Sequence, residues 1–382
     1  MKSICILGVS GSIGSQCLDI VSNNPNDFVI KGISIGDKTR KLSNILKKFP
    51  SIKYVCLKHK KKYYEELYPH INFYHGDKGL IKVIKESNSE MIINALVGFV
   101  GLKPSLETLK ENKILALANK ESLVVGGELI NKLIRNHHGK LYPIDSEHVG
   151  LAKCLSVDST DVEKLIITAS GGSLREYSID KLASATKDEV LAHPTWSMGN
   201  KITVDSATMM NKLFEVIEAY QLYHYPSNKI EILMHKESKI HALVKYLDGS
   251  YRLDYSKPDM HNPIKWAMYE GLISFDTYKV NDYHSFNDCS FFTLDYDRYP
   301  ILKWKDYVLN KKGDSGCIIN AANEVAVEAF LKGEISFTDI EKVVSKIMET
   351  SPVNNKISYS SLKKKDKEIR LLTRENIERR IV

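Results

Sequence analysis

The stretch from Ile4 to Val21, ICILGVSGSIGSQCLDIV, decides the fold of the first part of the chain. Its apolar start, residues 4–7, predicts a buried strand. Three glycines follow this strand at once: Gly8, Gly11 and Gly14. Apolar residues then recur at helical spacing: Ile13, Cys17, Ile20 and Val21. A strand, a glycine-rich turn and a helix predict a dinucleotide site, because the turn and the helix N-terminus offer N–H groups to a pyrophosphate. The spacing is G-x-x-G-x-x-G rather than the usual G-x-G-x-x-G, so a plain tight turn is the alternative.

Outward from this stretch, short apolar runs alternate with amphipathic segments as far as residue 145. The strand-like runs cover residues 4–7, 28–35, 54–57, 91–97 and 114–117. Such alternation predicts an α/β fold with a Rossmann-like, doubly wound parallel sheet and helices on both faces. Ligands of these sheets bind at the carboxyl ends of the strands. Residues 1–145 are therefore predicted to form a dinucleotide-binding domain.

After residue 145 the pattern becomes α+β and then helical. Residues 164–169 predict a buried strand, and a loop runs from 170 to about 203, long enough to act as a lid. A helix is expected from about 205 to 222 with Asp205 or Ser206 as its N-cap. Asp248-Gly249 predicts a hairpin turn between strands at 240–247 and 251–255. We expect a second, α+β domain over 146–274, a linker over 275–295, and a C-terminal helical domain over 296–382 with helices at 298–310, 317–332, 338–349 and 364–381.

Composition excludes several classes of protein. The chain has 382 residues, of which 43% are hydrophobic and 26% charged, values that disordered, collagen-like and disulfide-scaffold proteins do not share. The net charge of +7 is concentrated in two lysine-rich runs, 58–62 and 363–367, which are typical of solvated faces. Neither a nucleic-acid-binding module nor an apolar run of roughly 18 residues is visible, so we expect no nucleic-acid or membrane partner.

The cysteines and the N-terminus bear on the compartment. None of the six cysteines forms a C-x-x-C pair, which favours buried, reduced thiols over zinc ligands or disulfides. The first strand begins almost at Met1, and no signal peptide precedes it. We therefore expect a cytoplasmic protein of bacterial type. A plastid-like organelle is the alternative if a leader has been removed.

The end of the second predicted strand bears on the choice between NAD and NADP. It reads Ile35-Gly36-Asp37-Lys38-Thr39-Arg40. An acidic residue here binds a ribose 2′-hydroxyl, whereas basic residues suit a 2′-phosphate. Lys38 and Arg40 favour NADP and Asp37 favours NAD, so the residues alone leave both open with NADP preferred.

Two carboxylates follow the last apparent strand of the first domain. In extended backbone, Asp145 and Glu147 point to the same side. Such a pair suits a hard divalent cation or general acid and base catalysis. The alternative is a solvated turn.

The helix predicted at 205–222 carries a second polar group of residues. Its core stripe is formed by Met209, Leu213, Val216, Ile217 and Tyr220. The other stripe contains Thr208, Asn211, Lys212 and Glu215. An amide, an ammonium and a carboxylate in this order can hold phosphate oxygens and a metal ion together. An ordinary exposed helix face is the alternative.

Other polar signals lie in loops at strand ends. Ser170, in the segment Thr168 to Gly172, offers a hydroxyl and backbone amides to an anion. His193 and Trp196 lie in the predicted lid, where an indole suggests something to cover. Lys120 follows a strand and opens a helix near the same sheet edge.

Together these motifs resemble the 1-deoxy-D-xylulose 5-phosphate reductoisomerase family. The resemblance covers nearly the whole chain. It rests on GVSGSIG at 8–14, LANKESLVVGG at 117–127, PIDSEH at 143–148, TASGGSLRE at 168–176, HPTWSMGNKITVDSATMMNK at 193–212, and INAANEVAVEAFL at 319–331.

The resemblance implies an activity, cofactors and partners. Members of this family rearrange and reduce 1-deoxy-D-xylulose 5-phosphate to 2-C-methyl-D-erythritol 4-phosphate, with hydride from NADPH and Mg²⁺, Mn²⁺ or Co²⁺ as Lewis acid, in the non-mevalonate isoprenoid pathway. The family is homodimeric. Residues 1–145 would then form the NADPH-binding domain, and 146–274 would serve both catalysis and dimerisation.

Site residues follow from the same resemblance, position by position. The implied metal ligands are Asp145, Glu147 and Glu215, and the implied catalytic residues are these three with Lys120 and His193. The implied substrate contacts are Lys120, Ser146, Glu147, Ser170, His193, Trp196, Met198, Ser206, Asn211 and Lys212. The implied cofactor contacts are Ser10, Gly11, Ser12, Ile13, Gly36, Lys38, Asn119, Glu121 and Gly199.

The sequence departs from the family pattern at four places, none of which is an implied ligand to the metal. Val9 replaces a common serine, Asp37-Lys38 replaces a basic residue and asparagine, Leu213-Phe214 replaces Gly-Leu, and the stretch from His235 to Ser238 replaces a Pro-Gln segment. The residues at the position that recognises the 2′-phosphate therefore differ from the family pattern.

Two rival functions stay open at this point. The first is a metal-independent, NADP-dependent dehydrogenase of a phosphorylated aldehyde, against which the three carboxylates argue. The second is a basic NADP-binding regulator or nucleic-acid binder, which predicts no turnover and salt-dependent polyanion binding.

Overall fold

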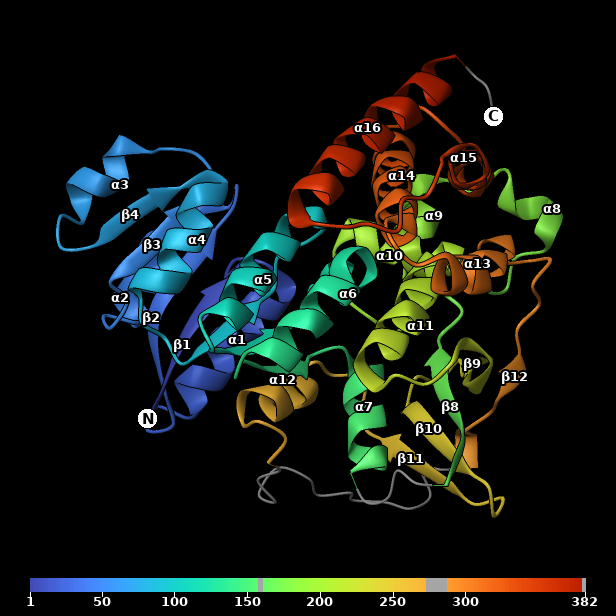
Figure 1. Cartoon of the computed structure of the whole chain (residues 1–382), viewed down its shortest axis with the longest axis horizontal. Coiled ribbons are helices and arrows are strands. Elements are labelled where there is room, and N and C mark those ends of the chain that lie inside the picture. The colour runs from blue at the N-terminus through green and yellow to red at the C-terminus, as the bar shows by residue number, and fades with distance from the viewer. Residues whose placement is uncertain (157–160, 273–286, 380–382) are drawn as a thin grey trace. The chain divides into compact units, whose positions relative to one another are not determined.

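The structure of the protein, a computed structural model, describes residues 1–156, 161–272 and 287–379. The chain divides into two compact units. The first contains Met1–Ser122, Leu129–Asp145 and Met260–Ile273, and the second contains Leu123–Glu128, Ser146–Asp259 and Ser274–Val382. The fold is mixed α/β, with a parallel sheet in the first unit and helices at the C-terminal end of the chain, as predicted (Figure 1).

The first unit is built on a seven-stranded sheet whose strand pairings are all parallel. The strands, in sequence order, are β1 Lys2–Leu7, β2 Phe28–Ile35, β3 Tyr54–Leu57, β4 Asn72–His75, β5 Met91–Asn94, β6 Ile114–Leu117 and β7 Lys140–Pro143. Their order in the sheet is β4-β3-β2-β1-β5-β6-β7. The winding direction changes at β1, so the crevice where ligands of such sheets bind lies at the carboxyl end of this strand.

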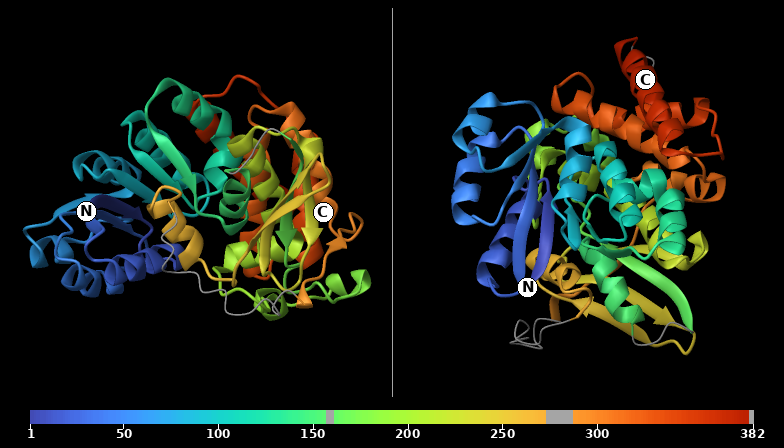
Figure 2. Two further views of the ribbon diagram at one scale, coloured as in Figure 1. Left: turned by 90° about the horizontal axis from the view of Figure 1, so that it is seen from below. Right: turned by 60° about the vertical axis from the view of Figure 1, so that its left-hand side comes forward.

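Apolar side chains cover both faces of this sheet. In β1, Ile4 and Ile6 belong to one buried cluster, whereas Cys5 and Leu7 belong to another on the opposite face. Strands covered on both faces read as continuous apolar runs, which is why the sequence indicated them. The helices of this unit are α1 Ser12–Asn23, α2 Leu42–Lys48, α3 Lys62–Leu67, α4 Gly76–Glu86, α5 Leu102–Lys110 and α12 His261–Met268. Helix α6 Glu121–Asn136 is shared, because its residues Leu123–Glu128 belong to the second unit. Helix α12 comes from much later in the chain and packs on α1 (Figure 2).

The second unit contains a smaller, mixed sheet. Its strands are β8 Val162–Ala169, β9 Ile230–Met234, β10 Ile240–Tyr246, β11 Tyr251–Tyr255 and β12 Phe292–Thr293, in the order β11-β10-β8-β9-β12. The predicted hairpin is confirmed, because β10 and β11 pair antiparallel around Gly249. Strand β12 lies within the segment predicted as a linker, of which residues 275–286 fall outside the described part of the chain.

Helices pack around the centre of the second unit. They are α7 Ser146–Leu155, α8 Ile179–Leu182, α9 Lys187–Leu191, α10 Asn200–Thr208, α11 Met210–Tyr223, α13 Trp304–Lys311, α14 Ser315–Leu331, α15 Phe337–Thr350 and α16 Tyr359–Glu378. Helix α14 is buried along almost its whole length and packs against α15, α16 and α10. One apolar core therefore joins the C-terminal helices to β8 and α11. The predicted end of the last helix at 381 lies beyond the described residues.

Two predictions about residues 170–222 are wrong. The segment 170–203 is not one long loop, since it contains α8 and α9 and the start of α10. The single helix expected from 205 is two helices, because Met209 adopts a left-handed backbone with φ of +64° and separates α10 from α11. Asp205 is consequently a buried residue inside α10 and not an N-cap, which is Gly199.

Candidate active site

The carboxyl ends of β6 and β7 carry the first part of the site. Lys120 follows β6 and is almost fully buried, and its ammonium forms an ion pair with the Asp145 carboxylate, which follows β7. Adjacent parallel strands end at the same edge, so chain topology brings these two residues together. Asn119 is also buried there, and its amide donates to Leu96 O, Gly98 O and Glu121 Oε2. Its side chain thus fixes the loop after β5 at the end of the sheet.

The extended backbone predicted for Asp145 to Glu147 is wrong, because helix α7 begins at Ser146. Its first turn presents Glu147 to Lys212 of α11. Lys212 lies between Glu147 and Glu215, with its Nζ 2.7 Å from Glu147 Oε1 and 2.5 Å from Glu215 Oε2. The same ammonium donates to Thr168 O at 2.6 Å. Asn211 Nδ2 donates to Glu215 Oε1 at 2.5 Å. The polar stripe of this helix is therefore part of a buried ionic network and not an exposed helix face.

The buried charges of this network stabilise one another. Burial by itself would raise the pKa of Glu147, but the Lys212 ammonium and the Ser146 hydroxyl, which donates to Glu147 Oε2 at 2.6 Å, outweigh it and hold that pKa well below its usual range. Burial would likewise lower the pKa of Lys212, but Glu147 and Glu215 outweigh it and raise that pKa. Both groups are consequently charged at neutral pH.

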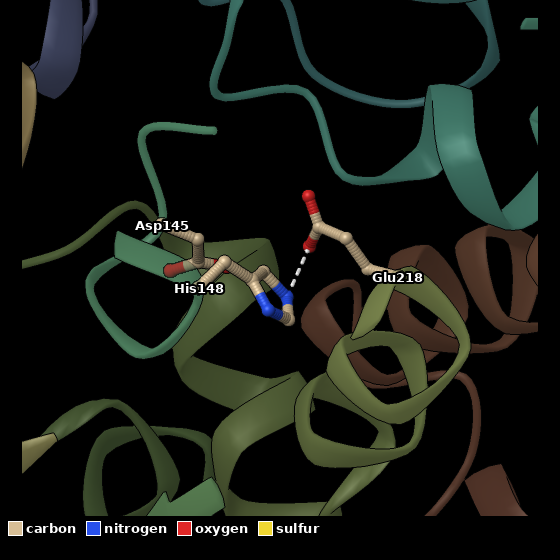
Figure 3. A group of neighbouring side chains, drawn as sticks. All are labelled: Asp145, His148 and Glu218. Atoms are coloured by element: carbon tan, nitrogen blue, oxygen red, sulfur yellow. Dashed lines mark ion pairs between the residues drawn. The ribbon is translucent and has the colours of Figure 1, made fainter. Parts of the chain in front are cut away.

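Three carboxylates meet at the start of α7. Oxygens of Asp145, Glu147 and Glu215 lie within 4.8 Å of one another, a distance that a single hard cation can bridge. A second group within the same distance contains Asp145, His148 and Glu218 (Figure 3). There, His148 Nε2 and the Glu218 carboxylate are fully buried and form an ion pair of 2.9 Å, drawn as the dashed line in Figure 3. Because hard cations such as Mg²⁺ prefer oxygen ligands, the all-carboxylate group is the better site for such an ion.

Ser170 and His193, which were predicted to contact the substrate, lie against each other. His193 Nδ1 accepts from the backbone N–H groups of Thr195 and Trp196, so the ring proton is on Nε2, and this nitrogen lies 3.1 Å from Ser170 Oγ. Burial, with a smaller contribution from the Arg175 charge, lowers the pKa of His193 to about 4. His193 is therefore a neutral donor at pH 7, and the Ser170 hydroxyl can direct its own proton to a ligand.

The loop after β8 packs closely on the helix that carries Ser206. Gly172 has φ of +70°, and a Cβ added to it would meet Ala207 Cα at 2.6 Å. Arg175 holds the same loop by donating to Ser170 O at 2.9 Å and Lys236 O at 3.0 Å. Ser170 and Ser206 are consequently brought to one place by backbone contact, 36 positions apart in the sequence.

The predicted lid residues lie before α10. Trp196 and Met198 are half-buried, and Gly199 is exposed as the N-cap of α10. The Trp196 ring lies 6.1 Å from the ring of His241, centroid to centroid. His241 is buried on β10, where burial lowers its pKa and the Glu147 charge opposes that shift. Sequence reasoning missed His241, whose only signal is its place among apolar residues near the start of the strand.

The predicted cofactor residues surround the glycine turn after β1. Ser10, Gly11, Ser12 and Ile13 form the turn and the first residues of α1, while Gly36 and Lys38 follow β2. Gly8 has φ of +86°, and a Cβ there would meet Ala95 O at 2.6 Å, so only glycine allows this close approach. Helix α1 begins without a side-chain cap, which leaves its N-terminal N–H groups available to an anionic ligand. The predicted geometry of a dinucleotide turn is therefore present.

Family models match three segments of the chain. The model described as 1-deoxy-D-xylulose 5-phosphate reductoisomerase matches residues 4–127, and two models of C-terminal domains of that enzyme match residues 141–223 and 255–372. The matches together span most of the length of the chain.

Relatives of known name agree with these models. A 1-deoxy-D-xylulose 5-phosphate reductoisomerase of Macrococcus caseolyticus is 40% identical over 92% of this chain and 94% of its own length. The enzyme of that name from Geobacillus kaustophilus is 41% identical over 93% of this chain and 94% of its own length. Among solved structures, a reductoisomerase in complex with NADPH, fosmidomycin and magnesium matches with a TM-score of 0.92 at 31% identity, over 99% of this chain and 98% of its own. The enzyme from Zymomonas mobilis in complex with NADPH matches with a TM-score of 0.89 at 32% identity over 99% of both chains.

Proposed function

Because the chain belongs to the 1-deoxy-D-xylulose 5-phosphate reductoisomerase family, we infer that it converts 1-deoxy-D-xylulose 5-phosphate to 2-C-methyl-D-erythritol 4-phosphate. The reaction uses NADPH and a divalent metal ion and belongs to non-mevalonate isoprenoid biosynthesis. Solved relatives contain NADPH and magnesium, which supports this pair of cofactors. The enzyme is thus an NADP-dependent oxidoreductase that also isomerises its substrate.

One observation carries the assignment of the metal site. Oxygens of Asp145, Glu147 and Glu215 lie within 4.8 Å of one another beside the Lys120 and Lys212 ammonium groups. Three hard oxygen donors fit Mg²⁺, Mn²⁺ or Co²⁺. When bound, such an ion supplies Lewis-acid polarisation of the ketone and neighbouring hydroxyl of the substrate. The rival function, a metal-independent dehydrogenase, does not explain why three carboxylates are clustered here.

The chain's own residues bind and orient the substrate. We assign its phosphate group to Ser170, His193, Ser206, Asn211 and Lys212, which lie on or beside the loop after β8 and the two helices α10 and α11. His193 donates from Nε2 as a neutral group, so it keeps this role through the physiological pH range. The remote phosphate contributes binding energy that orders the reacting part of the molecule.

Lys120 and Ser146 complete the site around the reacting carbons. Lys120 carries a buried positive charge beside Asp145, where it can stabilise negative charge that develops on substrate oxygens. Ser146 donates to Glu147 and so orients that carboxylate. Trp196 and Met198 are assigned to cover the substrate and to exclude water during rearrangement and hydride transfer.

The cofactor is assigned to the turn after β1 and the carboxyl ends of β2 and β6. The pyrophosphate would accept hydrogen bonds from backbone N–H groups at the start of α1. The residues assigned to this contact are Ser10, Gly11, Ser12 and Ile13. A Cβ built on Gly36 would have no atom within 4 Å, so there is room for a ligand at the end of β2. Further cofactor contacts are assigned to Lys38, Asn119, Glu121 and Gly199.

We also propose that the enzyme is a homodimer that uses the exposed face of the second sheet. Ile166, Ile240 and Leu243 form a buried apolar cluster beneath this face, and Ile166 and Leu243 also line a hollow of about 450 Å³. Tyr251 and Phe291 line the hollow and are 52% and 38% exposed. Ion pairs between Lys164 and Glu231 and between Lys245 and Glu163 border it, so an apolar centre is surrounded by a polar rim, as in protein interfaces.

The homodimer is tested by introducing charge on β11. Leu253 is 41% exposed on this strand, and Leu253→Glu is expected to convert the dimer to a monomer in sedimentation equilibrium. Leu247→Glu, at an exposed leucine beyond the end of β10, is the matched control and should stay dimeric. A monomeric wild-type chain, or equal dissociation of both variants, would contradict the proposal.

Functional domains and compartment also remain proposals. We propose the domain bounds predicted above, 1–145, 146–274 and 296–382, which family matches at 4–127, 141–223 and 255–372 support in part. A cytoplasmic location is supported by bacterial relatives and by six free cysteines. As a separate finding, none of the helices in the described part of the chain is long and apolar enough to cross a membrane.

The function is tested by turnover of the purified chain. With 1-deoxy-D-xylulose 5-phosphate and NADPH, we expect NADPH oxidation to match the formation of 2-C-methyl-D-erythritol 4-phosphate, measured by mass spectrometry. Chelation with EDTA should abolish both signals, and added Mg²⁺ or Mn²⁺ should restore them. NADPH oxidation that survives complete chelation would instead favour the dehydrogenase of a phosphorylated aldehyde.

A further inference from the structure

The acidic residue at the end of β2 is the feature of the cofactor site that fits NADPH least well. Asp37 follows Gly36 at the carboxyl end of this strand. A carboxylate at this position commonly accepts hydrogen bonds from the ribose 2′-hydroxyl of NAD and repels the 2′-phosphate of NADP. The chain must therefore either prefer NADH or neutralise Asp37.

The structure shows that Asp37 is neutralised from the neighbouring strand. Lys58 Nζ lies 3.0 Å from Asp37 Oδ2. Lys58 directly follows β3, whose last residue, Leu57, is in register with Ile35 at the end of β2. The backbone N–H of Lys58 donates to Ile35 O at 3.3 Å, so both strand ends are held side by side. The hydrogen bond and charge of Lys58 lower the pKa of Asp37, and His59 and Lys61 add smaller effects in the same direction.

A buried threonine fixes the loop that carries Asp37. Thr39 is 5% exposed, and its carbonyl oxygen accepts from the Tyr64 hydroxyl at 2.9 Å. Lys61 Nζ donates to Thr39 Oγ1 at 2.8 Å, which places a second ammonium group at this sheet edge. The path of the loop is consequently set by contacts with the segment after β3. The pairing of Asp37 with Lys58 follows from this path rather than from local sequence.

The charge balance at this edge favours an anionic ligand. The single carboxylate of Asp37 is accompanied by six cationic side chains on residues 36–41 and 58–61, which follow β2 and β3: Lys38, Arg40, Lys41, Lys58, Lys60 and Lys61. A phosphate monoester carries roughly two negative charges at pH 7, so it can be accommodated beside the carboxylate. Lys58 and Asp37 are 55% and 73% exposed, and exposed ion pairs are weak, so Lys58 can share its ammonium with an incoming phosphate at little cost.

We propose that Lys58, reaching from the end of β3, is the residue that selects NADPH over NADH in this enzyme. It neutralises Asp37 and binds the 2′-phosphate, with Lys61 holding the loop in place. This inference rests on the proposed function in one respect only, namely that the dinucleotide lies along the carboxyl ends of β1 and β2. Preference for NADPH or NADH is usually predicted from the residues that follow β2, whereas Lys58 follows β3.

The test is direct binding to the full-length protein, measured by calorimetry with NADPH, NADH and 2′,5′-ADP. Lys58→Ala is expected to weaken the binding of NADPH and of 2′,5′-ADP about tenfold, because one phosphate contact is lost. The affinity for NADH should change less than about twofold. Asp37→Asn is expected to increase the affinity for NADPH about threefold, because it removes a negative charge near the 2′-phosphate, and not to lower the affinity for NADH. Lys53→Ala, at an exposed lysine beside the opposite end of β3, is the matched control and should change the affinity for neither dinucleotide.

Two results would overturn the inference. One is an NADPH affinity in Lys58→Ala equal to that in Lys53→Ala. The other is a tenfold loss of NADH affinity in Asp37→Asn with NADPH unchanged, since this would make Asp37 a ribose ligand. Failure of the proposed function looks different, because a wild-type chain that binds neither dinucleotide and does not turn over the substrate contradicts the function itself. Turnover with NADPH and an unchanged Lys58→Ala variant would contradict only the role of Lys58.

Discussion

Replacement of Glu215 by glutamine is expected to lower turnover by about three orders of magnitude, because the loss of one anionic ligand removes several kcal/mol of metal-dependent stabilisation. Glu215 is 1% exposed, contacts Lys212, and accepts from Asn211. Glutamine keeps the size of the side chain and can keep one hydrogen bond, so the fold should be retained. The loss of activity would therefore reflect the missing charge.

Three measurements separate this role from a structural one. The concentration of Mg²⁺ that gives half-maximal activity should rise strongly in Glu215→Gln, while the dissociation constant of NADPH should change less than about twofold, since the metal and the glycine turn are separate contacts. Glu341→Gln, at a half-buried glutamate on α15, is the control and should behave as wild type. Turnover of Glu215→Gln near the wild-type value would refute the assignment of Glu215 as a metal ligand.

Replacement of Lys212 by methionine is expected to destabilise the protein by roughly 3–5 kcal/mol, because it leaves buried carboxylates without their counterion. The Lys212 ammonium contacts Glu147, Glu215 and Thr168 O, and the side chain is 6% exposed. Methionine preserves much of the volume and none of the charge. Denaturant unfolding at pH 7 measures the loss. Lys245→Met, which breaks a more exposed pair with Glu163, should cost less than about 1 kcal/mol.

The pH dependence of the Lys212→Met variant should run opposite to that of the wild type. In the wild type the pKa of Glu147 is depressed, so the stability it contributes is present above the unfolded value of about 4.5 and is lost as pH falls. Without Lys212, burial raises the carboxylate pKa values, so stability is retained below that value and lost as pH rises. Mg²⁺ should restore part of the lost stability, since it binds only the folded site. A loss no larger than that of Lys245→Met, or no response to Mg²⁺, would contradict this account.

The sequence determined the parallel sheet because its strands are buried on both faces. Continuous apolar runs at β1, β2, β3 and β6 need no information from distant residues to be read as strands. Strand β4, Asn72–His75, was missed because it lies at the edge of the sheet and its side chains are exposed or half-buried. The short helix α9 was missed although Thr186 and Glu189 form a capping box that the sequence displays.

The chemistry of the site was only partly visible in the sequence. The three carboxylates were singled out by spacing and by family resemblance, and their roles as metal ligands remain predictions. The break at Met209 was not predictable, since methionine favours helices and its left-handed backbone is imposed by tertiary packing. His241 and Lys58 carried no local signal strong enough to connect them to Glu147 or to Asp37.

The sequence by itself thus determined which candidate functional motifs the chain contains and their order along it: a glycine turn, a carboxylate pair, a predicted anion-binding loop and a polar helix stripe. Only the tertiary structure decided which of these charges are buried and which ones face each other. Lys212 lies 65 residues from Glu147, and Lys58 lies 21 residues from Asp37. The charge state and ligand preference of a side chain depend on burial and on partners within a few ångströms, and for these residues both are set by contacts between distant segments.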